Sequence, residues 1–210
     1  MPLLKELILN NAKIALWHIA EDHSFFINAL QPTITESILG NISNSKKQLE
    51  FLASRYLIKH LAGNEYLANL NKTDNGKPFF YNFPEAISIS HSASHAAIIF
   101  SNTYSCGIDI ETITPRVHKI ASRFLSEEEL ISLDERYLTE AITLLWSAKE
   151  TIYKWYGKGE ISFSKQINLQ QPFKFEEKGT LSFNFKIEGL IHRVEVNYEV
   201  LGNQILTYTL

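Results

Sequence analysis

The alternation of apolar and polar positions predicts several β-strands along the chain. Residues 107–111 have the sequence Gly-Ile-Asp-Ile-Glu, and the side chains of a strand point alternately to its two faces. We therefore expect Asp109 and Glu111 on one face, with Ile108 and Ile110 on the other. Similar patterns predict further strands at residues 14–19, 87–90, 96–100, 173–175, 181–187, 194–200 and 205–210. The strands after residue 160 alternate strictly, which favours antiparallel pairing.

Two longer segments repeat apolar residues every three or four positions and predict the main helices. The first covers residues 46–61, and Gly63 is suited to end it. The second covers residues 139–156, ends before Gly157, and carries an apolar stripe made of Ala141, Leu144, Leu145, Ala148, Ile152 and Trp155. On this helix Glu150 lies roughly opposite the stripe, with Trp146 and Lys154 one turn to either side.

A shorter helix is predicted after Ser126. The pattern Ser126-Glu-Glu-Glu129 is a capping box, in which the serine oxygen accepts a free N–H and Glu129 reaches back to the start of the helix. The helix is expected to run to about Leu133.

The order of these elements predicts an α+β fold. Strands flank a main helix twice, without the alternating strand–helix rhythm of a parallel sheet. We expect two lobes of similar topology, residues 1–105 and 106–210, each an antiparallel sheet packed with a main helix. The chain of 210 residues is long enough for this and shows no internal sequence repeat.

Composition narrows the class of protein. Hydrophobic residues make up 45% and charged residues 20%, as in ordinary globular proteins, and the net charge of −3 gives no reason to expect nucleic-acid binding. Cys106 is the one cysteine, so an internal disulfide is excluded, which fits a reducing compartment. No apolar run has transmembrane length, and the start lacks the order of a signal peptide, so a cytoplasmic location without membrane contact is expected.

Three carboxylates suggest a metal site. Asp109 and Glu111 on one strand face repel each other unless a cation or a proton lies between them. Glu150 offers a third carboxylate, and such oxygen ligands suit Mg²⁺ shared with a phosphate substrate. The same residues also fit a polar strand face with a surface ion pair between Glu150 and Lys154.

Several motifs, taken together, carry a family resemblance. They are Asn75-Gly76-Lys77-Pro78, Ser88-Ile-Ser90-His91-Ser92, Gly107-Ile-Asp-Ile-Glu111, Arg123-Phe-Leu-Ser126 with Glu129, Trp146-Ser-Ala-Lys149-Glu150 through Lys154, and Gly157-Lys158-Gly159. In this order and spacing, over residues 46–169, the chain resembles the 4′-phosphopantetheinyl transferases of the surfactin-synthetase-activating type.

The resemblance implies a monomer with a pseudo-twofold α+β fold, holding coenzyme A and Mg²⁺ between its lobes. Such an enzyme moves phosphopantetheine from coenzyme A to a serine of an acyl or peptidyl carrier protein, and adenosine 3′,5′-bisphosphate leaves. The carrier itself, whether for fatty acid, polyketide, peptide or aminoadipate reduction, is left open.

The resemblance also implies roles for individual residues. Asp109, Glu111 and Glu150 look like Mg²⁺ ligands, Arg55 and His91 like contacts to the 3′-phosphate, Lys77 and Ser90 like residues lining the nucleotide pocket, and Lys154 like the diphosphate contact. Asp109, Glu150 and Lys154 are the expected catalytic residues, and either Glu150 or a water on the metal would accept the serine proton. By themselves Arg55 also fits a surface arginine and His91 a turn histidine.

Two departures and two other functions stay open. Residues 33–45 lack the basic side chains that many relatives carry there, and Thr151 stands where Ala or Ser is usual. The same carboxylates could serve another Mg²⁺-dependent phosphohydrolase or nuclease. A non-catalytic carrier-protein-binding module is the other alternative, but it would be expected to have lost a carboxylate or Lys154.

Overall fold

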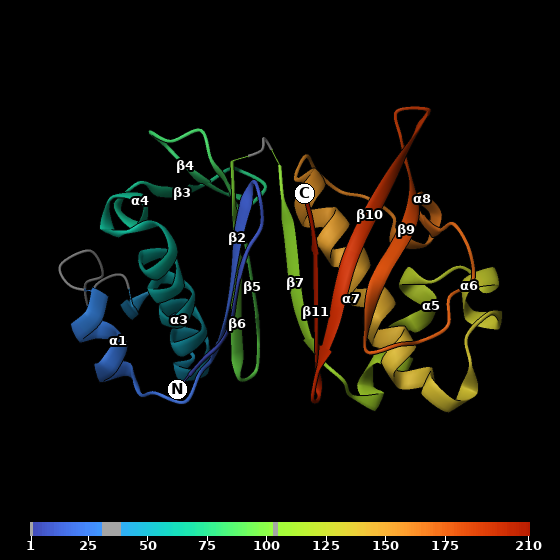
Figure 1. Ribbon diagram of the computed structural model, residues 1–210, viewed down its shortest axis with the longest axis horizontal. Helices are drawn as coiled ribbons and strands as arrows, with labels where there is room; N and C mark the ends of the chain where they lie inside the picture. The colour runs from blue at the N-terminus through green and yellow to red at the C-terminus, as the bar shows by residue number, and fades with distance from the viewer. Residues whose placement is uncertain (1, 31–38, 103–104) are drawn as a thin grey trace. The chain divides into compact units, whose positions relative to one another are not determined.

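The computed structural model describes residues 2–30, 39–102 and 105–210 of the chain (Figure 1). The chain divides into two compact units, Met1–Cys106 together with Leu210, and Gly107–Thr209. Each unit contains one antiparallel sheet and one long helix packed against it. The predicted α+β class, with two lobes of the same kind, is confirmed, whereas the pseudo-twofold relation between the lobes stays a prediction.

The N-terminal unit contains a six-stranded sheet in the order β1-β2-β6-β5-β4-β3, and all neighbouring strands run antiparallel. Its strands are β1 (Leu3–Ile8), β2 (Ala12–His18), β3 (Leu70–Lys72), β4 (Pro78–Phe80), β5 (Ala86–Ser92) and β6 (His95–Ser101). The Asn75-Gly76 turn joins β3 to β4, and Gly76 has the positive φ of 80° that the turn requires.

Helix α3 (Ser45–Ala62) covers this sheet, lying against β2, β5 and β6 (Figure 1). The side chain of Asn44 caps its first turn by accepting from the Lys47 N–H, and Gly63, with φ of 94°, follows its last residue. The buried residues of α3 include Leu52, Ala53, Leu57, Ile58 and Leu61, which join the core of the unit. Two further helices of this unit are α1 (His23–Leu30) and α4 (Asn64–Ala68).

The C-terminal unit contains a five-stranded antiparallel sheet in the order β7-β11-β10-β9-β8. Its strands are β7 (Gly107–Thr112), β8 (Ile167–Leu169), β9 (Lys178–Ile187), β10 (Leu190–Leu201) and β11 (Gln204–Thr209). Helix α7 (Leu138–Tyr156) packs against β7, β10 and β11 (Figure 1).

Short helices complete the C-terminal unit: η1 (Pro115–Ile120), α5 (Ala121–Phe124), α6 (Glu127–Ile131), η2 (Glu135–Tyr137) and α8 (Phe163–Gln166). The capping box predicted before α6 is confirmed, because Ser126 accepts from the Glu129 N–H while the Glu129 carboxylate accepts from the Ser126 N–H. None of the helices in the described parts of the chain is long and apolar enough to cross a membrane.

The strand predicted at residues 173–175 is wrong. This stretch has no strand structure, and the edge of the sheet is formed by the earlier segment β8. Phe173 and Phe175 pack against the core of the unit, and the ring of Phe175 stacks on Tyr137. The two phenylalanines are two residues apart and both pack against the core. The alternating pattern therefore reflects their burial, although this segment forms no hydrogen bonds of a β-sheet.

Candidate functional site

Strand β7 directs both of its carboxylates toward helix α7. Ser147 on α7 donates to Asp109 Oδ2 at 2.8 Å, and the indole Nε1 of Trp146 donates to Glu111 Oε1 at 2.8 Å. Asp109 is almost fully buried between the strand and the helix. The alternation predicted for residues 107–111 is therefore confirmed, since both acidic side chains leave the strand on the same face.

Gly107 lets the strand approach the helix this closely. A Cβ atom added at Gly107 would collide with the main-chain oxygen of Thr151 and would lie 3.0 Å from the main-chain nitrogen of Trp155. Both are backbone atoms of α7, which a side-chain rotation cannot move away. The absence of a side chain at residue 107 thus sets the distance between Asp109 and the turn of α7 that carries Glu150.

Helix α7 supplies the other two charged groups of the predicted site. Lys154 follows Glu150 by four residues, so the two side chains lie on neighbouring turns of one edge of the helix. The ammonium Nζ of Lys154 lies 2.7 Å from Asp109 Oδ1, and the lysine is partly exposed whereas the aspartate is buried. An ion pair thus joins α7 to β7, while the charge of Lys154 also opposes the rise in the pKa of Glu150.

The electrostatics show an excess of negative charge. Burial, followed by the charge of Asp109, raises the pKa of Glu111 to about 7, while Trp146 and Lys154 oppose the shift. The pKa of Glu150 is also raised to about 7, first by burial and then by Asp109. The carboxylates of Asp109, Glu111 and Glu150 therefore influence one another, and Lys154 offsets only part of their charge.

The donor set fits a hard divalent cation. A cation beside Glu111 and Glu150 would favour their ionised forms, whose pKa values are raised, and carboxylate oxygens are the ligands that Mg²⁺ prefers. Within the described residues, however, no group of three His, Cys, Asp or Glu side chains is arranged to hold a metal ion. The convergence of Asp109, Glu111 and Glu150 on one ion stays a prediction.

A buried ion pair that the sequence did not reveal fixes the turn of α7 next to Glu150. Lys149 is fully buried, and its Nζ donates to Glu129 Oε2 at 2.7 Å and to the Phe124 carbonyl at 2.8 Å. Burial lowers the pKa of Lys149, which the carboxylate of Glu129 opposes. Glu129 also accepts from the Leu169 N–H, so the pair ties α7 to α5, α6 and β8.

The predicted nucleotide contacts lie in the N-terminal unit. Arg55 on α3 has its guanidinium 3.8 Å from the centre of the Phe51 ring and donates to Ser54 Oγ at 2.9 Å, and burial lowers its pKa to about 10. His91 on β5 lies against α3, because its Nδ1 is 3.3 Å from Glu50 Oε2.

Two further predicted residues belong to the same unit. Ser90 is buried on β5, directly before His91. Lys77 lies between β3 and β4, and its Nζ donates to Ser105 Oγ at 3.4 Å. The structure therefore groups the predicted metal ligands with Lys154 in the C-terminal unit and the predicted nucleotide contacts in the N-terminal one. A cleft that would combine the two groups stays a prediction.

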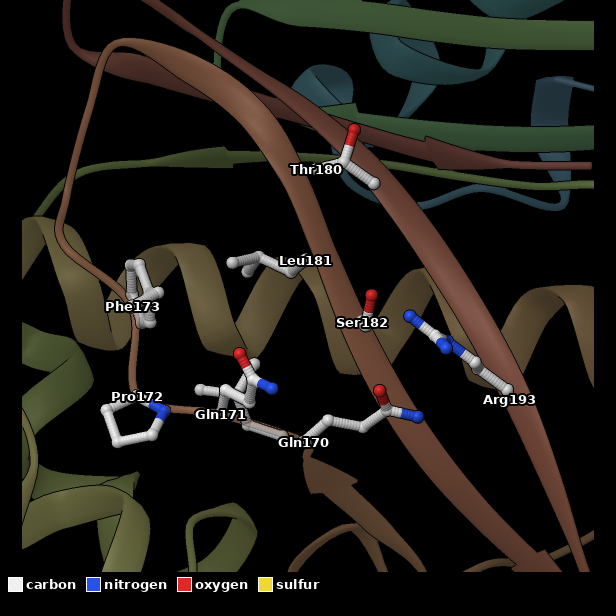
Figure 2. A pocket seen from close by; sticks show the side chains of 9 residues that line it. Gln170, Gln171, Pro172, Phe173, Thr180, Leu181, Ser182 and Arg193 are labelled. Carbon is white, nitrogen blue, oxygen red and sulfur yellow. The ribbon is translucent and has the colours of Figure 1, made fainter.

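Of two hollows in the C-terminal unit, one adjoins the predicted site carboxylates and the other does not. The hollow in Figure 2 lies beside β9 and is lined by Gln170, Ser182 and Arg193 among others, with none of the predicted site residues. A second, more apolar hollow is lined by Arg123, Phe163 and the ring of Trp146. Because Trp146 also holds Glu111, only the second hollow adjoins the candidate site.

Comparison with known proteins agrees with this arrangement. Residues 105–209, half of the chain, match the family model described as the 4′-phosphopantetheinyl transferase superfamily. The chain is 35% identical over 125 residues to the 4′-phosphopantetheinyl transferase gsp of Aneurinibacillus migulanus, covering 57% of this chain and 52% of that protein.

Two relatives from Bacillus subtilis match shorter stretches. The 4′-phosphopantetheinyl transferase Sfp of strain 168 is 39% identical over 88 residues, which cover 40% of this chain and 39% of Sfp. The 4′-phosphopantetheinyl transferase ffp is 34% identical over 114 residues, covering 49% of this chain and 50% of that protein. The chain thus spans about half the length, or less, of the curated relatives it matches. The matched half contains β7, α7 and all four charged residues of the candidate site, and the chain belongs to the 4′-phosphopantetheinyl transferase superfamily.

Proposed function

We propose that this protein transfers the 4′-phosphopantetheine group of coenzyme A to a serine of an acyl or peptidyl carrier protein. The observation that carries the proposal is that Asp109, Glu111 and Glu150 influence one another electrostatically, with the ammonium of Lys154 placed on Asp109. The names of the relatives, all 4′-phosphopantetheinyl transferases, support the same reaction class.

The proposed reaction requires the negative charge of the coenzyme A diphosphate to be neutralised, and the residues of the site suit this requirement. In the transfer, the serine oxygen forms a bond to the β-phosphorus of coenzyme A, the bond from that phosphorus to the bridging oxygen breaks, and adenosine 3′,5′-bisphosphate leaves. Little covalent chemistry is required of the protein, so positioning and electrostatic stabilisation dominate such reactions. Mg²⁺, when bound by Asp109, Glu111 and Glu150, supplies positive charge that neutralises the diphosphate.

The remaining roles belong to side chains of the chain itself. Lys154 has a flexible stem and is partly exposed. Its ammonium can therefore contact the departing phosphate, with or without keeping its contact to Asp109, and stabilise the negative charge that develops there. Glu150 is the protein group proposed to accept the serine proton. Trp146 and Ser147 hold Glu111 and Asp109 from the helix side, which limits the movement of both carboxylates.

The N-terminal unit is proposed to bind the nucleotide end of coenzyme A. Arg55 lies over Phe51 and donates to the Ser54 hydroxyl, and a guanidinium group is suited to bind a phosphate. His91, Lys77 and Ser90 are the further proposed contacts. The cytoplasmic location and the monomeric state are part of the same proposal.

Intact-mass measurement of carrier proteins tests the function directly. The protein is incubated with coenzyme A, Mg²⁺ and an apo acyl or peptidyl carrier protein, and the carrier should gain the mass of phosphopantetheine. A carrier whose acceptor serine is replaced by alanine serves as the control and should stay unmodified. Release of adenosine 3′,5′-bisphosphate without any carrier would instead favour a phosphohydrolase, and an unmodified panel of carriers would contradict the proposal.

A further inference from the structure

Three buried hydroxyl groups lie between helix α7 and the strand that bears Asp109. Ser147 and Thr151 are on α7, and Thr207 is on β11; all three side chains are 0% exposed. Ser147 and Thr151 are four residues apart, so they share one face of the helix. Thr207 is the register partner of Asp109 in the β7–β11 pair, which places both side chains on the same face of the sheet.

The hydroxyls form a continuous chain of hydrogen bonds. Thr151 Oγ1 lies 2.6 Å from Thr207 Oγ1, Thr207 Oγ1 lies 2.9 Å from Ser147 Oγ, and Ser147 Oγ lies 2.8 Å from Asp109 Oδ2. Thr207 Oγ1 is also 3.0 Å from the Ser147 carbonyl, and Thr151 Oγ1 is 3.3 Å from the Thr207 carbonyl.

The chemistry of the groups fixes the direction of this chain. An ionised carboxylate only accepts hydrogen bonds, and each hydroxyl has a single hydrogen to donate. Ser147 must therefore donate to Asp109. Thr207 has one hydrogen for two acceptors of Ser147, the carbonyl at 3.0 Å and Oγ at 2.9 Å, so Thr207 is the donor to Ser147 whichever of the two takes the hydrogen. Thr151 is then the donor to Thr207 Oγ1. Thr207 thus holds Ser147, and Ser147 in turn donates to Asp109.

This direction has a consequence for the carboxylate. A serine within a helix can otherwise donate to a carbonyl of the preceding turn. By donating to the carbonyl and Oγ of Ser147, Thr207 holds this residue in place while the serine O–H is directed to Asp109. One carboxylate oxygen is then held by Ser147 and the other by Lys154, so the plane of the carboxylate is fixed from two sides.

We propose that Thr207, supported by Thr151, is a positioning residue that acts through Ser147 to hold Asp109 oriented for the divalent cation. The inference rests on the proposed function, because it assigns Asp109 as a ligand. Thr207 itself touches neither substrate nor metal. Removing a group that orients a metal ligand typically weakens metal binding by 10–100-fold, so the effect is measurable.

The test measures binding of Mn²⁺, an EPR-visible substitute for Mg²⁺, to the full chain in the presence of coenzyme A. Thr207→Val keeps the shape of the side chain and removes the hydroxyl, whereas Thr207→Ser keeps the hydroxyl. Thr209→Val is the matched control, because Thr209 is a buried threonine on the same strand whose hydroxyl donates to the Glu195 carbonyl. Asp109→Ala reports the loss of the ligand itself.

We expect the Mn²⁺ dissociation constant to rise about tenfold in Thr207→Val. Thr207→Ser and Thr209→Val should stay close to the unmodified protein, while Asp109→Ala should bind weakest. Thermal unfolding checks that each variant is folded. If Thr207→Val does not fold, Thr151→Val compared with Thr151→Ser makes the same comparison one hydroxyl further along the chain.

Two results overturn the inference and are distinguishable from each other. Equal Mn²⁺ affinity of the folded valine and serine variants would show that the hydroxyl chain does not position Asp109, while the proposed function would stand. Absence of Mn²⁺ binding in the unmodified protein, together with unmodified carrier proteins, would remove the proposed function and the inference with it.

Discussion

The two long helices cover similar antiparallel sheets, but they bury different chemistry against them. In the N-terminal unit, α3 contributes mainly apolar side chains to the core, such as Leu52 and Leu57. In the C-terminal unit, α7 buries Ser147, Lys149 and Thr151 beside its apolar residues. A polar interface of this kind is stable only when every buried group has a hydrogen-bond partner, and α7 meets this condition through β7, β11 and Glu129.

The difference suggests a division of labour between the units. The polar interface under α7 holds the proposed metal ligands and the group that meets the leaving phosphate, so changes there should act on turnover. The predicted nucleotide contacts of the N-terminal unit lie on α3 and β5, beside an apolar interface. Changes at those residues should act on the affinity for coenzyme A.

The largest expected effect is the loss of Asp109. Asp109→Ala removes the carboxylate that Ser147 and Lys154 both contact, and we expect turnover to fall by about 10³-fold, as when a main electrostatic element is removed. The rate of carrier modification at saturating coenzyme A measures this. Asp134→Ala, at a partly exposed aspartate of the same unit, is the control and should keep its rate. Equal rates in both variants would remove Asp109 from the mechanism.

The second prediction compares the loss of stability when a buried lysine of α7 or a lysine of α3 is replaced by methionine. Lys149→Met leaves the Glu129 carboxylate buried without its cation and should lower the free energy of unfolding by about 3–5 kcal/mol. Lys59→Met loses one hydrogen bond to the Ala29 carbonyl and should cost about 1 kcal/mol. Urea unfolding measures both values. The comparison between the helices fails if the two substitutions cost the same.

The third prediction concerns the role of Lys154. Lys154→Ala should lower turnover about a hundredfold with little change in coenzyme A affinity, because its charge matters most as the leaving group develops. Lys154→Arg keeps the charge but is a poor proton donor. Substantial rescue by arginine at saturating coenzyme A would indicate electrostatic stabilisation alone, whereas full activity of the alanine variant would exclude Lys154 from the reaction.

The smallest expected effect lies in the N-terminal unit. Arg55→Ala should raise the Michaelis constant for coenzyme A about tenfold, the value of one charge-assisted hydrogen bond. Dephospho-coenzyme A lacks the 3′-phosphate and serves as the matched control, so its Michaelis constant should change little. His91→Ala is expected to behave in the same way. Equal effects on both substrates would rule out a 3′-phosphate role for these residues.

The amino-acid sequence by itself determined the long elements and the identity of the charged groups. The predicted helices at residues 46–61 and 139–156 correspond to α3 and α7 within one residue at each end, because apolar periodicity and terminal glycines act locally. The alternation at residues 107–111 correctly placed Asp109 and Glu111 on one face. The capping box at Ser126 also followed from neighbouring residues alone.

Only the tertiary structure decided which partners these groups have. The sequence offered a surface pair of Lys154 with Glu150 as an alternative, and it did not show that the Lys154 ammonium also pairs with Asp109, 45 residues away in sequence. The hydroxyl chain through Thr207 and the ion pair of Lys149 with Glu129 also join residues from separate elements. A local sequence pattern therefore does not predict these contacts. Gly107 shows the physical reason: the backbone of α7 passes so close to β7 that a single methyl group would not fit, and this approach brings Ser147, Trp146 and Lys154 to the carboxylates of β7.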